Sequence, residues 1–286
     1  MTDLRANLTQ THTGTRGLHT EPRLPLFLRL ARAARSAVFV LVLLAYLTFF
    51  TGLGQRIIVV PFTWLFPVRA VRLHGAWARL QGRNLLRLLR VFAGVRITTE
   101  GSIGPESCIV IMNHQSMVDI AIGFSIVPGH LALIPTRRRY AWGIPGVSVF
   151  VRLARLPLIS QKRKNIRADL AMLAEAVERT RRGETSFFIF PEGHRTKDGS
   201  ILPFMTRGLR LALTRIKRPV YCVVGDGMWK VRTLAEMMAR VAGTDIRVRV
   251  IGPFDPPQQE ADIPEFIQTI RERMTAALED MRTNAR

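Results

Sequence analysis

From residue 95 onward, short runs of β-branched and aromatic residues alternate with longer stretches of helical periodicity. The short runs are "VRITTE", "SCIVIM", "HLALIP", "TSFFIF", "PVYCVVG" and "IRVRVIG", and the clearest helical stretches are residues 165–182 and 264–282. Strands that alternate with helices usually build a sheet buried between helical layers. The pattern therefore predicts an α/β fold with a mostly parallel or mixed central sheet flanked by helices.

The first third of the chain has a different character. Residues 36–54, "SAVFVLVLLAYLTFFTGLG", contain no charged side chain. The length of this segment is marginal for a bilayer span, which needs about 20 apolar residues. A second apolar piece, residues 57–66, follows a break at Gly52, Gly54 and Arg56, and its Pro61 interrupts a straight helix. We expect the two pieces to form an N-terminal membrane-associated helical hairpin that turns near residues 52–56.

Basic residues outnumber acidic ones, with 42 Lys and Arg against 21 Asp and Glu and a formal net charge of +21. Such a charge predicts a polyanionic partner, either nucleic acid or an anionic membrane surface. Six arginines follow the apolar pieces at helical spacing: Arg69, Arg72, Arg79, Arg83, Arg87 and Arg90. A solvated surface helix fits this spacing, but an interfacial helix facing anionic lipid fits it better because an apolar segment directly precedes it. We expect anionic membrane lipids as partners and no nucleic acid.

Composition divides the chain into three parts. Residues 1–22 are polar and predict a disordered tail, residues 23–94 a membrane-associated helical region, and residues 95–286 an α/β domain. Both cysteines, Cys108 and Cys222, lie in apolar runs, where a thiol packs as a small hydrophobe. The His and Cys spacings match no metal-binding pattern, so we expect no metal site.

A polar cluster, "NHQSMVD", follows the apolar run "SCIVIM". His114 and Asp119 would lie about 140° apart on an uninterrupted helix and would not meet. They can meet if His114 lies in the turn before a helix and Asp119 in its first turn. The carboxylate would then accept the imidazole N–H, so that the imidazole could act as a general base for an alcohol. Taken alone, the cluster also fits a capped turn with an incidental histidine.

A second cluster, "FFIFPEGHRTKDGS", has the same layout, because an apolar run ends at Pro191 and is followed by Glu192, Gly193 and Arg195. Glycine permits close approach of the backbone, and arginine can bind phosphate or carboxylate through two parallel hydrogen bonds. By itself, "PEG" is a common turn.

Together the two clusters resemble the glycerolipid acyltransferase family, best known from the 1-acylglycerol-3-phosphate acyltransferases. The N-H-x4-D block of the family is matched by Asn113, His114 and Asp119, and its F-P-E-G-T-R block by Phe190, Pro191, Glu192, Gly193 and Arg195. The resemblance extends over residues 73–252. Four blocks depart from the family pattern, at Ser160, Gln161, His194, Met205 and Cys222. These departures gather in acceptor-binding parts, so the resemblance supports acyl transfer better than any particular acceptor.

The resemblance implies a membrane-bound O-acyltransferase that needs no cofactor. A fatty acyl group would pass from a thioester donor, acyl-CoA or acyl carrier protein, to the free hydroxyl of a lysophospholipid such as 1-acylglycerol-3-phosphate, giving phosphatidate in phospholipid biosynthesis. His114, held by Asp119, would be the general base. The expected substrate-binding residues are Asn113, Arg138, Arg139, Glu192, Gly193 and Arg195, and the two neighbouring arginines are also candidates for stabilising the oxyanion.

Three alternatives remain open. The acceptor could be another lysolipid, such as a lyso-ornithine lipid. The chain could be a non-catalytic basic protein that only binds membranes. His114 and Asp119 could instead serve a thioesterase or metal hydrolase that uses water as the acceptor.

The membrane topology follows from charge and function together. Arg29, Arg32 and Arg35 place the N-terminal side of the apolar segment in the cytoplasm by the positive-inside rule. One full crossing would then export the catalytic part, although the thioester donors are cytoplasmic. We therefore expect a monotopic protein, or one with a single membrane anchor, on the cytoplasmic face of a bacterial-type inner membrane.

Overall fold

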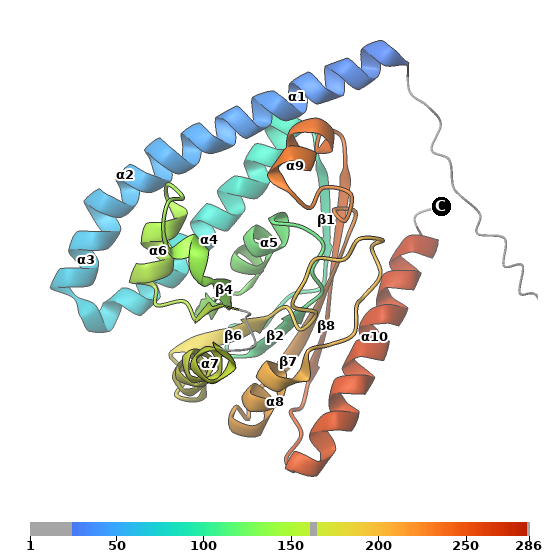
Figure 1. The fold of residues 1–286 in the computed structure, drawn as a ribbon. Helices are drawn as coiled ribbons and strands as arrows, with labels where there is room; N and C mark the ends of the chain where they lie inside the picture. Colours follow the sequence, from blue (N-terminus) through green and yellow to red (C-terminus); the bar gives the residue numbers. More distant parts are fainter. Residues whose placement is uncertain (1–24, 161–164, 285–286) are drawn as a thin grey trace, which may run out of the picture.

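The computed structural model describes residues 25–160 and 165–284, so the predicted tail at residues 1–22 lies outside the described residues. Six strands form the main sheet in the order β1-β8-β7-β2-β6-β3 (Figure 1). Each overlaps one of the six β-branched or aromatic runs: β1 Arg96–Glu100, β2 Ile109–Met112, β3 Leu131–Leu133, β6 Thr185–Ile189, β7 Val220–Asp226 and β8 Asp245–Phe254.

The sheet is mixed. Strands β7, β2, β6 and β3 are parallel, whereas β8 is antiparallel to β7 and parallel to β1. Every residue of β2, β6 and β7 is buried, which explains why these strands are continuous apolar runs. The predicted fold class is confirmed.

Alternate residues of the central strands face two separate layers of helices. Ile109 and Ile111 belong to the core that also holds α7 (Ile166–Arg181), α8 (Thr206–Arg215) and α10 (Ile263–Thr283). Val110 and Met112 belong to the opposite core, which holds α5 (Val118–Ile126), α9 (Leu234–Arg240) and part of α1 (Leu26–Ala45). A two-stranded parallel sheet, β4 (Thr136–Arg137) with β5 (Leu158–Ile159), and helix α6 (Val147–Leu153) complete the domain.

The N-terminal apolar residues form one long helix. It runs through α1, a π-helical stretch Tyr46–Thr51, α2 (Gly52–Gly54), a second π-helical stretch Gln55–Val59 and α3 (Val60–Leu65). This helix, Leu26–Leu65, is long and apolar enough to cross a membrane by length and composition. Pro61 lies within it directly after a π-helical stretch, where the backbone hydrogen-bond register already changes.

The predicted turn near residues 52–56 is wrong, because the chain reverses at Phe66, between α3 and α4 (Pro67–Leu88). Gly54, one of the glycines that suggested a turn, serves close helix packing instead. A Cβ atom on Gly54 would lie 2.6 Å from the Trp77 ring of α4. The hydroxyls of Tyr46 and Thr51 also donate to the side-chain oxygen of Gln81 on α4, at 2.7 and 2.8 Å.

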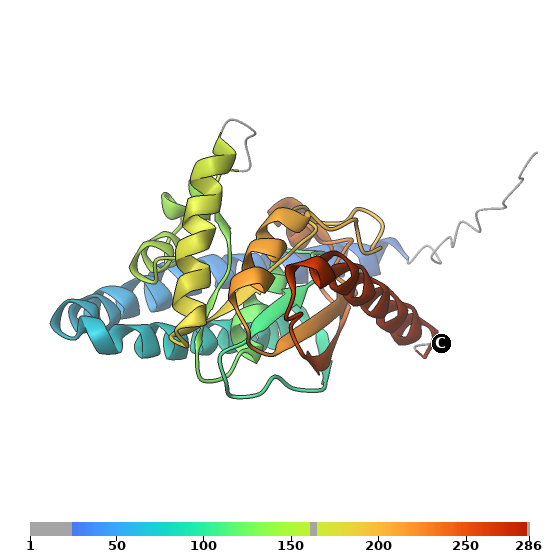
Figure 2. The same cartoon turned by 90° about the horizontal axis from the view of Figure 1, so that it is seen from below.

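Both arms of this helical hairpin are attached to the α/β domain. On α1, Phe39 and Val40 are buried in the same core as α9, and the Ser36 hydroxyl accepts a hydrogen bond from the backbone of Ala242 at 3.0 Å. On α4, a Cβ atom added to Gly82 would meet the backbone of α5 at 2.6 Å. Figures 1 and 2 both show the helix pair extending past one side of the sheet.

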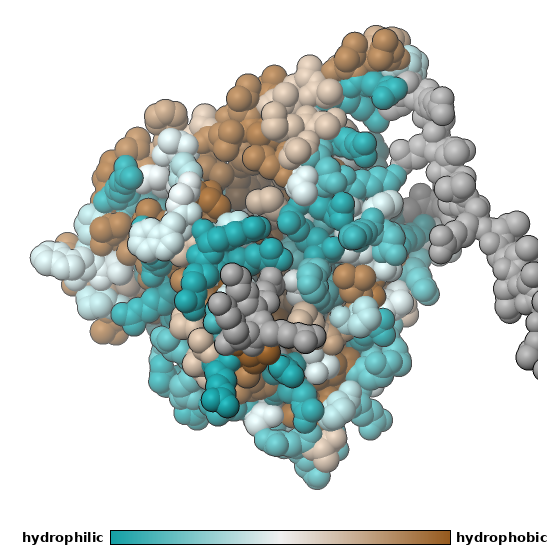
Figure 3. Space-filling model, viewed as in Figure 1, coloured by the Kyte–Doolittle hydropathy of each residue, from teal (hydrophilic) through white to brown (hydrophobic). Residues whose placement is uncertain are grey.

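The part of the hairpin that extends past the sheet carries exposed apolar side chains. Figure 3 shows hydrophobic residues gathered along α1–α3, whereas most of the remaining face is hydrophilic. We call this surface the apolar face; its most exposed members are Leu41, Phe49, Phe50, Ile57, Ile58, Trp64, Leu65 and Val68. An exposed apolar surface of this extent is typical of a membrane or protein contact.

Candidate active site

The two polar clusters meet at one edge of the main sheet. Strand β2 lies between β7 and β6, and Ile111 pairs with Cys222 on one side and Ile189 on the other. Because the three strands are parallel, the residues that follow them emerge side by side. The clusters are 78 positions apart in the chain, yet the backbone N–H of His114 donates to Glu192 at 2.8 Å.

His114 and Asp119 form a hydrogen-bonded pair, as the sequence predicted. His114 lies in the turn before α5, and Asp119 lies in the first turn of that helix. Nδ1 of His114 donates to Oδ2 of Asp119 at 2.9 Å, because a carboxylate can only accept. Nε2 is then the unprotonated nitrogen, and the imidazole remains 17% exposed. This arrangement can remove a proton from a bound hydroxyl.

One oxygen of Asp119 accepts three hydrogen bonds. Besides the imidazole, the backbone N–H groups of Gln115 and Ser116 donate to Oδ2 at 2.6 and 2.7 Å. The carboxylate side chain is 3% exposed, so these donors replace the water that burial removes. Asp119 therefore fixes both the histidine ring and the turn that carries it.

Asn113 joins the ends of β2 and β7. Its side-chain nitrogen donates to the carbonyl of Gly225 at 2.8 Å, and its side-chain oxygen accepts from the backbone N–H of Gly225 at 2.7 Å. Asn113 is buried, so the structure places it behind the histidine as a clamp between two strands.

Glu192 supports the site through the backbone. One carboxylate oxygen accepts from His114 N–H at 2.8 Å, and the other accepts from Leu202 N–H at 2.9 Å. Burial raises the pKa of Glu192 to about 7, although the N–H groups of Leu202 and His114 favour the charged form. Gly193 has a φ of 67°, and a Cβ atom there would lie 2.3 Å from the sulfur of Met205, so this position requires glycine.

The loop after β6 also touches the histidine directly. The Phe190 ring stacks on the His114 ring with centroids 4.3 Å apart, and Thr196 N–H donates to the carbonyl of His114 at 2.9 Å. Arg195, the residue before Thr196, is half-buried and donates to the carbonyl of Arg232. The structure therefore brings Arg195 next to the catalytic turn.

Arg138 and Arg139 lie further away. They begin the 3₁₀ helix Arg138–Ala141, which follows β3 and β4, and β3 is separated from β2 by β6. Both arginines are exposed, and Arg139 donates to the hydroxyl of Tyr140 at 2.9 Å. Two strand spacings separate β2 from β3, roughly 10 Å, so this position favours a contact at the rim of the site.

A second polar network holds the turn from behind. The Gln115 side chain donates to Asp226 at the end of β7 at 3.3 Å and accepts from Met228 N–H at 3.1 Å. Arg282, near the end of α10, donates to the two oxygens of Asp226 at 2.8 and 3.1 Å. Burial alone would raise the pKa of Asp226, but the Arg282 guanidinium and the Gln115 amide outweigh it and lower the pKa.

No pattern in the sequence indicates this second network. Arg282 is 56 positions from Asp226, and an isolated arginine near a chain end is ordinary. Gln115 lies inside the "NHQSMVD" cluster, but its place in that cluster does not reveal which residue its side chain binds. Only the packing of α10 beside β7 brings the three side chains together.

The described residues contain no group of three or more His, Cys, Asp or Glu that could hold a metal ion. Both cysteines are free and fully buried, as predicted. Burial raises the pKa of the Cys108 thiol to about 11, which disfavours the nucleophilic thiolate.

Comparison with known proteins agrees with the geometry. The model of a family described as Acyltransferase matches residues 94–226, which contain the His114–Asp119 pair and the Glu192 loop. By this similarity the chain is an acyltransferase. It is 25% identical over 228 residues to a 1-acyl-sn-glycerol-3-phosphate acyltransferase alpha from Ovis aries, covering 77% of this chain and 76% of that protein.

Two further relatives extend the comparison. A 1-acyl-sn-glycerol-3-phosphate acyltransferase from Cocos nucifera is 27% identical over 225 residues, which cover 77% of this acyltransferase and 68% of the plant protein. The crystal structure of the 1-acyl-sn-glycerophosphate acyltransferase PlsC from Thermotoga maritima superposes with a TM-score of 0.63 at 23% identity. The superposition covers 87% of this chain and 98% of PlsC, so the two proteins share a fold over most of their length.

Proposed function

We propose that this acyltransferase moves a fatty acyl group from a thioester donor, acyl-CoA or acyl carrier protein, to the free hydroxyl of 1-acylglycerol-3-phosphate. The product would be phosphatidate, a precursor in phospholipid biosynthesis. The observation that carries the proposal is the His114–Asp119 hydrogen bond through Nδ1, which leaves Nε2 of the neutral imidazole as the proton acceptor, on a side chain that is partly exposed at the edge of the sheet. The relatives named 1-acyl-sn-glycerol-3-phosphate acyltransferases support lysophosphatidate as the acceptor.

The reaction needs one base and no covalent intermediate on the protein. Nε2 of His114 takes the proton from the acceptor hydroxyl while the oxygen attacks the thioester carbonyl. Asp119 stabilises the imidazolium that forms, because its carboxylate accepts the Nδ1 proton at 2.9 Å. The carbon–sulfur bond then breaks, and the imidazolium returns the proton to the departing thiolate. The atoms balance as one ester and one thiol, without a metal or cofactor.

Arg195 supplies the positive charge for the acceptor's phosphate in this proposal. Its guanidinium has five N–H groups, of which one is used by the carbonyl of Arg232. Replacing Arg195 with alanine should mainly raise KM for an anionic lysolipid, because the lost contact acts on binding. A raised KM for the donor with an unchanged acceptor KM would assign Arg195 to the donor instead.

An assay of the purified protein tests the proposed function. Lysophosphatidate, a lyso-ornithine lipid and neutral lysolipids would each be offered with acyl-CoA and with acyl carrier protein donors. We expect phosphatidate to form and His114→Ala to reduce its formation by about 10²- to 10⁴-fold. Release of free fatty acid without consumption of the lysolipid would show hydrolysis, and near-normal transfer by His114→Ala would refute the mechanism.

We further propose that the protein is monotopic on the cytoplasmic face of the membrane. The first arm of the hairpin contacts the α/β domain at Val40 and again at Gln55, and the second arm returns along α4, so both arms are held on the same side. The apolar face between them would enter one leaflet and bring His114 to the headgroup of the lysolipid. The exposed arginines of α4, which include Arg83 and Arg87, suit anionic headgroups.

Cysteine labelling tests this topology. Single cysteines at Thr2 and Thr283, in a background without Cys108 and Cys222, would be exposed to a membrane-impermeant thiol reagent in intact cells. We expect neither site to react before lysis. Labelling of the Thr283 site before lysis would show that the chain crosses the membrane.

A further inference from the structure

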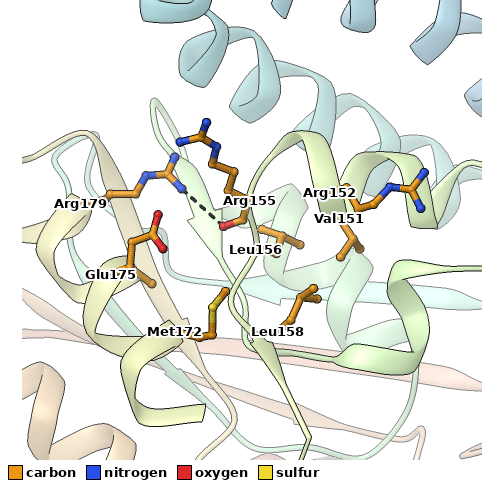
Figure 4. Close-up of a pocket in the computed structure, with 9 residues that line it drawn as sticks. Val151, Arg152, Arg155, Leu156, Leu158, Met172, Glu175 and Arg179 are labelled. Atoms are coloured by element: carbon orange, nitrogen blue, oxygen red, sulfur yellow. Dashed lines mark hydrogen bonds between the residues drawn. The ribbon is translucent and has the colours of Figure 1, made fainter. Parts of the chain in front are cut away.

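A pocket of about 380 Å³ lies between α6, β5 and α7, and it contains no residue of the candidate active site. Its lining is Val151, Arg152, Arg155, Leu156, Leu158, Met172, Glu175, Ala176 and Arg179. Figure 4 shows that the two ends of the pocket differ: Arg155 and Arg179 lie at one end, and Leu158 and Met172 lie at the other. The lining is therefore amphipathic along its length.

Arg155 occupies a backbone position that favours glycine. It has a φ of 51° and follows the end of α6. Its N–H donates to the carbonyl of Arg152 at 3.2 Å, and the next residue, Leu156, donates to the carbonyl of Val151 at 3.1 Å. This pair of bonds is the Schellman ending of a helix, in which the left-handed residue is usually glycine because a Cβ atom is strained there. A side chain kept at a strained position beside a pocket indicates a functional use for that side chain.

Arg179 is a buried cation with weak partners. It is 9% exposed, and its guanidinium lies 3.4 and 3.5 Å from the carbonyls of Ala154 and Arg155 and 3.8 Å from the carboxylate of Glu184. Burial lowers the pKa of Arg179; the carboxylates of Glu184 and Glu175 act against this effect, and the nearby charge of Arg155 acts with it. Two close guanidinium groups with such long contacts favour an additional anion between them.

The surroundings of the pocket indicate where this anion comes from. The guanidinium of Arg152 lies 4.2 Å from the ring centre of Trp142, which is 69% exposed. In the same loop the carbonyl of Gly146 accepts from the side chain of Gln55 on the long apolar helix at 2.6 Å. An exposed tryptophan beside an arginine is typical of a membrane interface. This loop thus connects the pocket to the long helix that carries the apolar face, and the exposed Trp142 suits a position at the level of lipid headgroups.

We propose that this pocket binds the headgroup of an anionic membrane phospholipid. The phosphate lies between Arg155 and Arg179, and the glycerol and first methylene groups lie over Leu158 and Met172. A volume of about 380 Å³ suits a headgroup, with the acyl chains outside. This inference rests on the proposed membrane association and assigns a specific residue set to the lipid contact, distinct from the arginines of α4.

Flotation of the full-length protein with vesicles tests the pocket. The vesicles contain phosphatidylcholine alone or phosphatidylcholine with phosphatidylglycerol. Arg155→Gly removes the guanidinium and suits the left-handed backbone, so we expect its Tm to equal or exceed that of the wild type. Arg210→Gln is the matched control, because it removes one exposed positive charge from α8.

We expect all three proteins to bind phosphatidylcholine vesicles equally, through the apolar face. Phosphatidylglycerol should strengthen vesicle binding by the wild type. Arg155→Gly should bind the phosphatidylglycerol vesicles at least tenfold more weakly than the wild type does. One positive charge near an anionic surface contributes about fivefold, so Arg210→Gln should lose no more than that. Equal losses in the two variants would overturn the proposal.

Soluble probes separate this result from the membrane association itself. In detergent, glycerol 3-phosphate should raise the Tm of Arg195→Ala, which lacks the proposed phosphate contact of the active site, and not that of Arg195→Ala combined with Arg155→Gly. No rise in either variant would overturn the proposal even if the vesicles bind. If the wild-type protein fails to float with phosphatidylcholine vesicles, the result contradicts the proposed membrane association and not the anion site of the pocket. If adenosine 3′,5′-bisphosphate stabilises the protein through Arg155 while phosphatidylglycerol has no Arg155-dependent effect, the occupant is a nucleotide and the lipid assignment is wrong.

Discussion

Asp119 has two separable tasks, and two substitutions distinguish them. Its Oδ2 accepts the imidazole N–H of His114 and the backbone N–H groups of Gln115 and Ser116. Because all three donors converge on one oxygen, Asp119→Asn can keep all three bonds by placing its amide oxygen there. Asp119→Ala removes all three. The first variant removes the negative charge alone, and the second removes the charge and the acceptor.

The structure gives a magnitude for each task. At 2.9 Å and an effective dielectric constant of about 20, the carboxylate charge stabilises an imidazolium by roughly 5 kcal/mol before solvation is counted. We therefore expect Asp119→Asn to lower turnover by about 10²- to 10⁴-fold while the fold persists. Each buried N–H left without an acceptor costs about 1–3 kcal/mol, so Asp119→Ala should also lose about 2–6 kcal/mol of stability. That is a large part of the ~5–15 kcal/mol of a typical domain.

The assay follows conversion of labelled lysophosphatidate to phosphatidate, and thermal unfolding in detergent reports stability. His114→Ala serves as the reference, because it removes the base and leaves the two backbone N–H groups satisfied. Transfer by Asp119→Asn within tenfold of the wild type would refute the role of the charge. Equal Tm values for Asp119→Ala and Asp119→Asn would refute the role of the acceptor.

Two further predictions concern the support of the catalytic turn. The pKa of Glu192 rises from an ordinary 4.5 to about 7, so the folded protein binds this proton more tightly than the unfolded chain does. The protonated Glu192 therefore contributes fully to the free energy of unfolding below pH 4.5, and this contribution is lost as pH rises through 7. Denaturant titrations from pH 5 to 8 should show a fall of about 3 kcal/mol that is absent in Glu192→Gln, and parallel curves would contradict this prediction. Arg282→Ala should lower kcat several-fold with little change in acceptor KM, because it releases Asp226 and Gln115 behind the turn. Arg249→Ala, which breaks exposed ion pairs of 2.5 and 2.7 Å to Asp280 and Glu100, is the control and should leave kcat unchanged.

Much of the fold could be predicted because burial leaves a direct trace in the sequence. All six runs became strands of one sheet. The central strands β2, β6 and β7 are buried on both faces, which is why their runs are mostly apolar. The periodic stretches at residues 165–182 and 264–282 became α7 and α10. Strand order and the antiparallel β8 could not be predicted, because they depend on contacts between distant segments.

The hairpin shows why glycine is ambiguous in a single sequence. Gly52 and Gly54 were interpreted as a turn, but the helix continues through both. The reason for Gly54 lies on another helix, where the Trp77 ring occupies the space that a side chain would need. Helix-to-helix contact of this kind has no local pattern that distinguishes it from a turn.

The candidate site was predictable where its residues are neighbours in the chain. His114 and Asp119 are five positions apart, and the turn that joins them is encoded locally. The clamp between Asn113 and Gly225 spans 112 positions, and the link between Gln115 and Asp226 spans 111. Such contacts are set by which strands are adjacent, so their roles become visible only in three dimensions.

The attachment of both hairpin arms to the α/β domain has a kinetic consequence. With α1 fixed beside α9 and α4 fixed beside α5, the hairpin cannot swing relative to His114. Once the apolar face is embedded, the height of the imidazole above the bilayer is constant, and the acceptor reaches it by lateral diffusion within the leaflet. The rate would then follow the mole fraction of lysolipid in the membrane. Adding inert phospholipid at constant bulk concentration would slow the reaction by surface dilution, although no molecule of substrate had been removed.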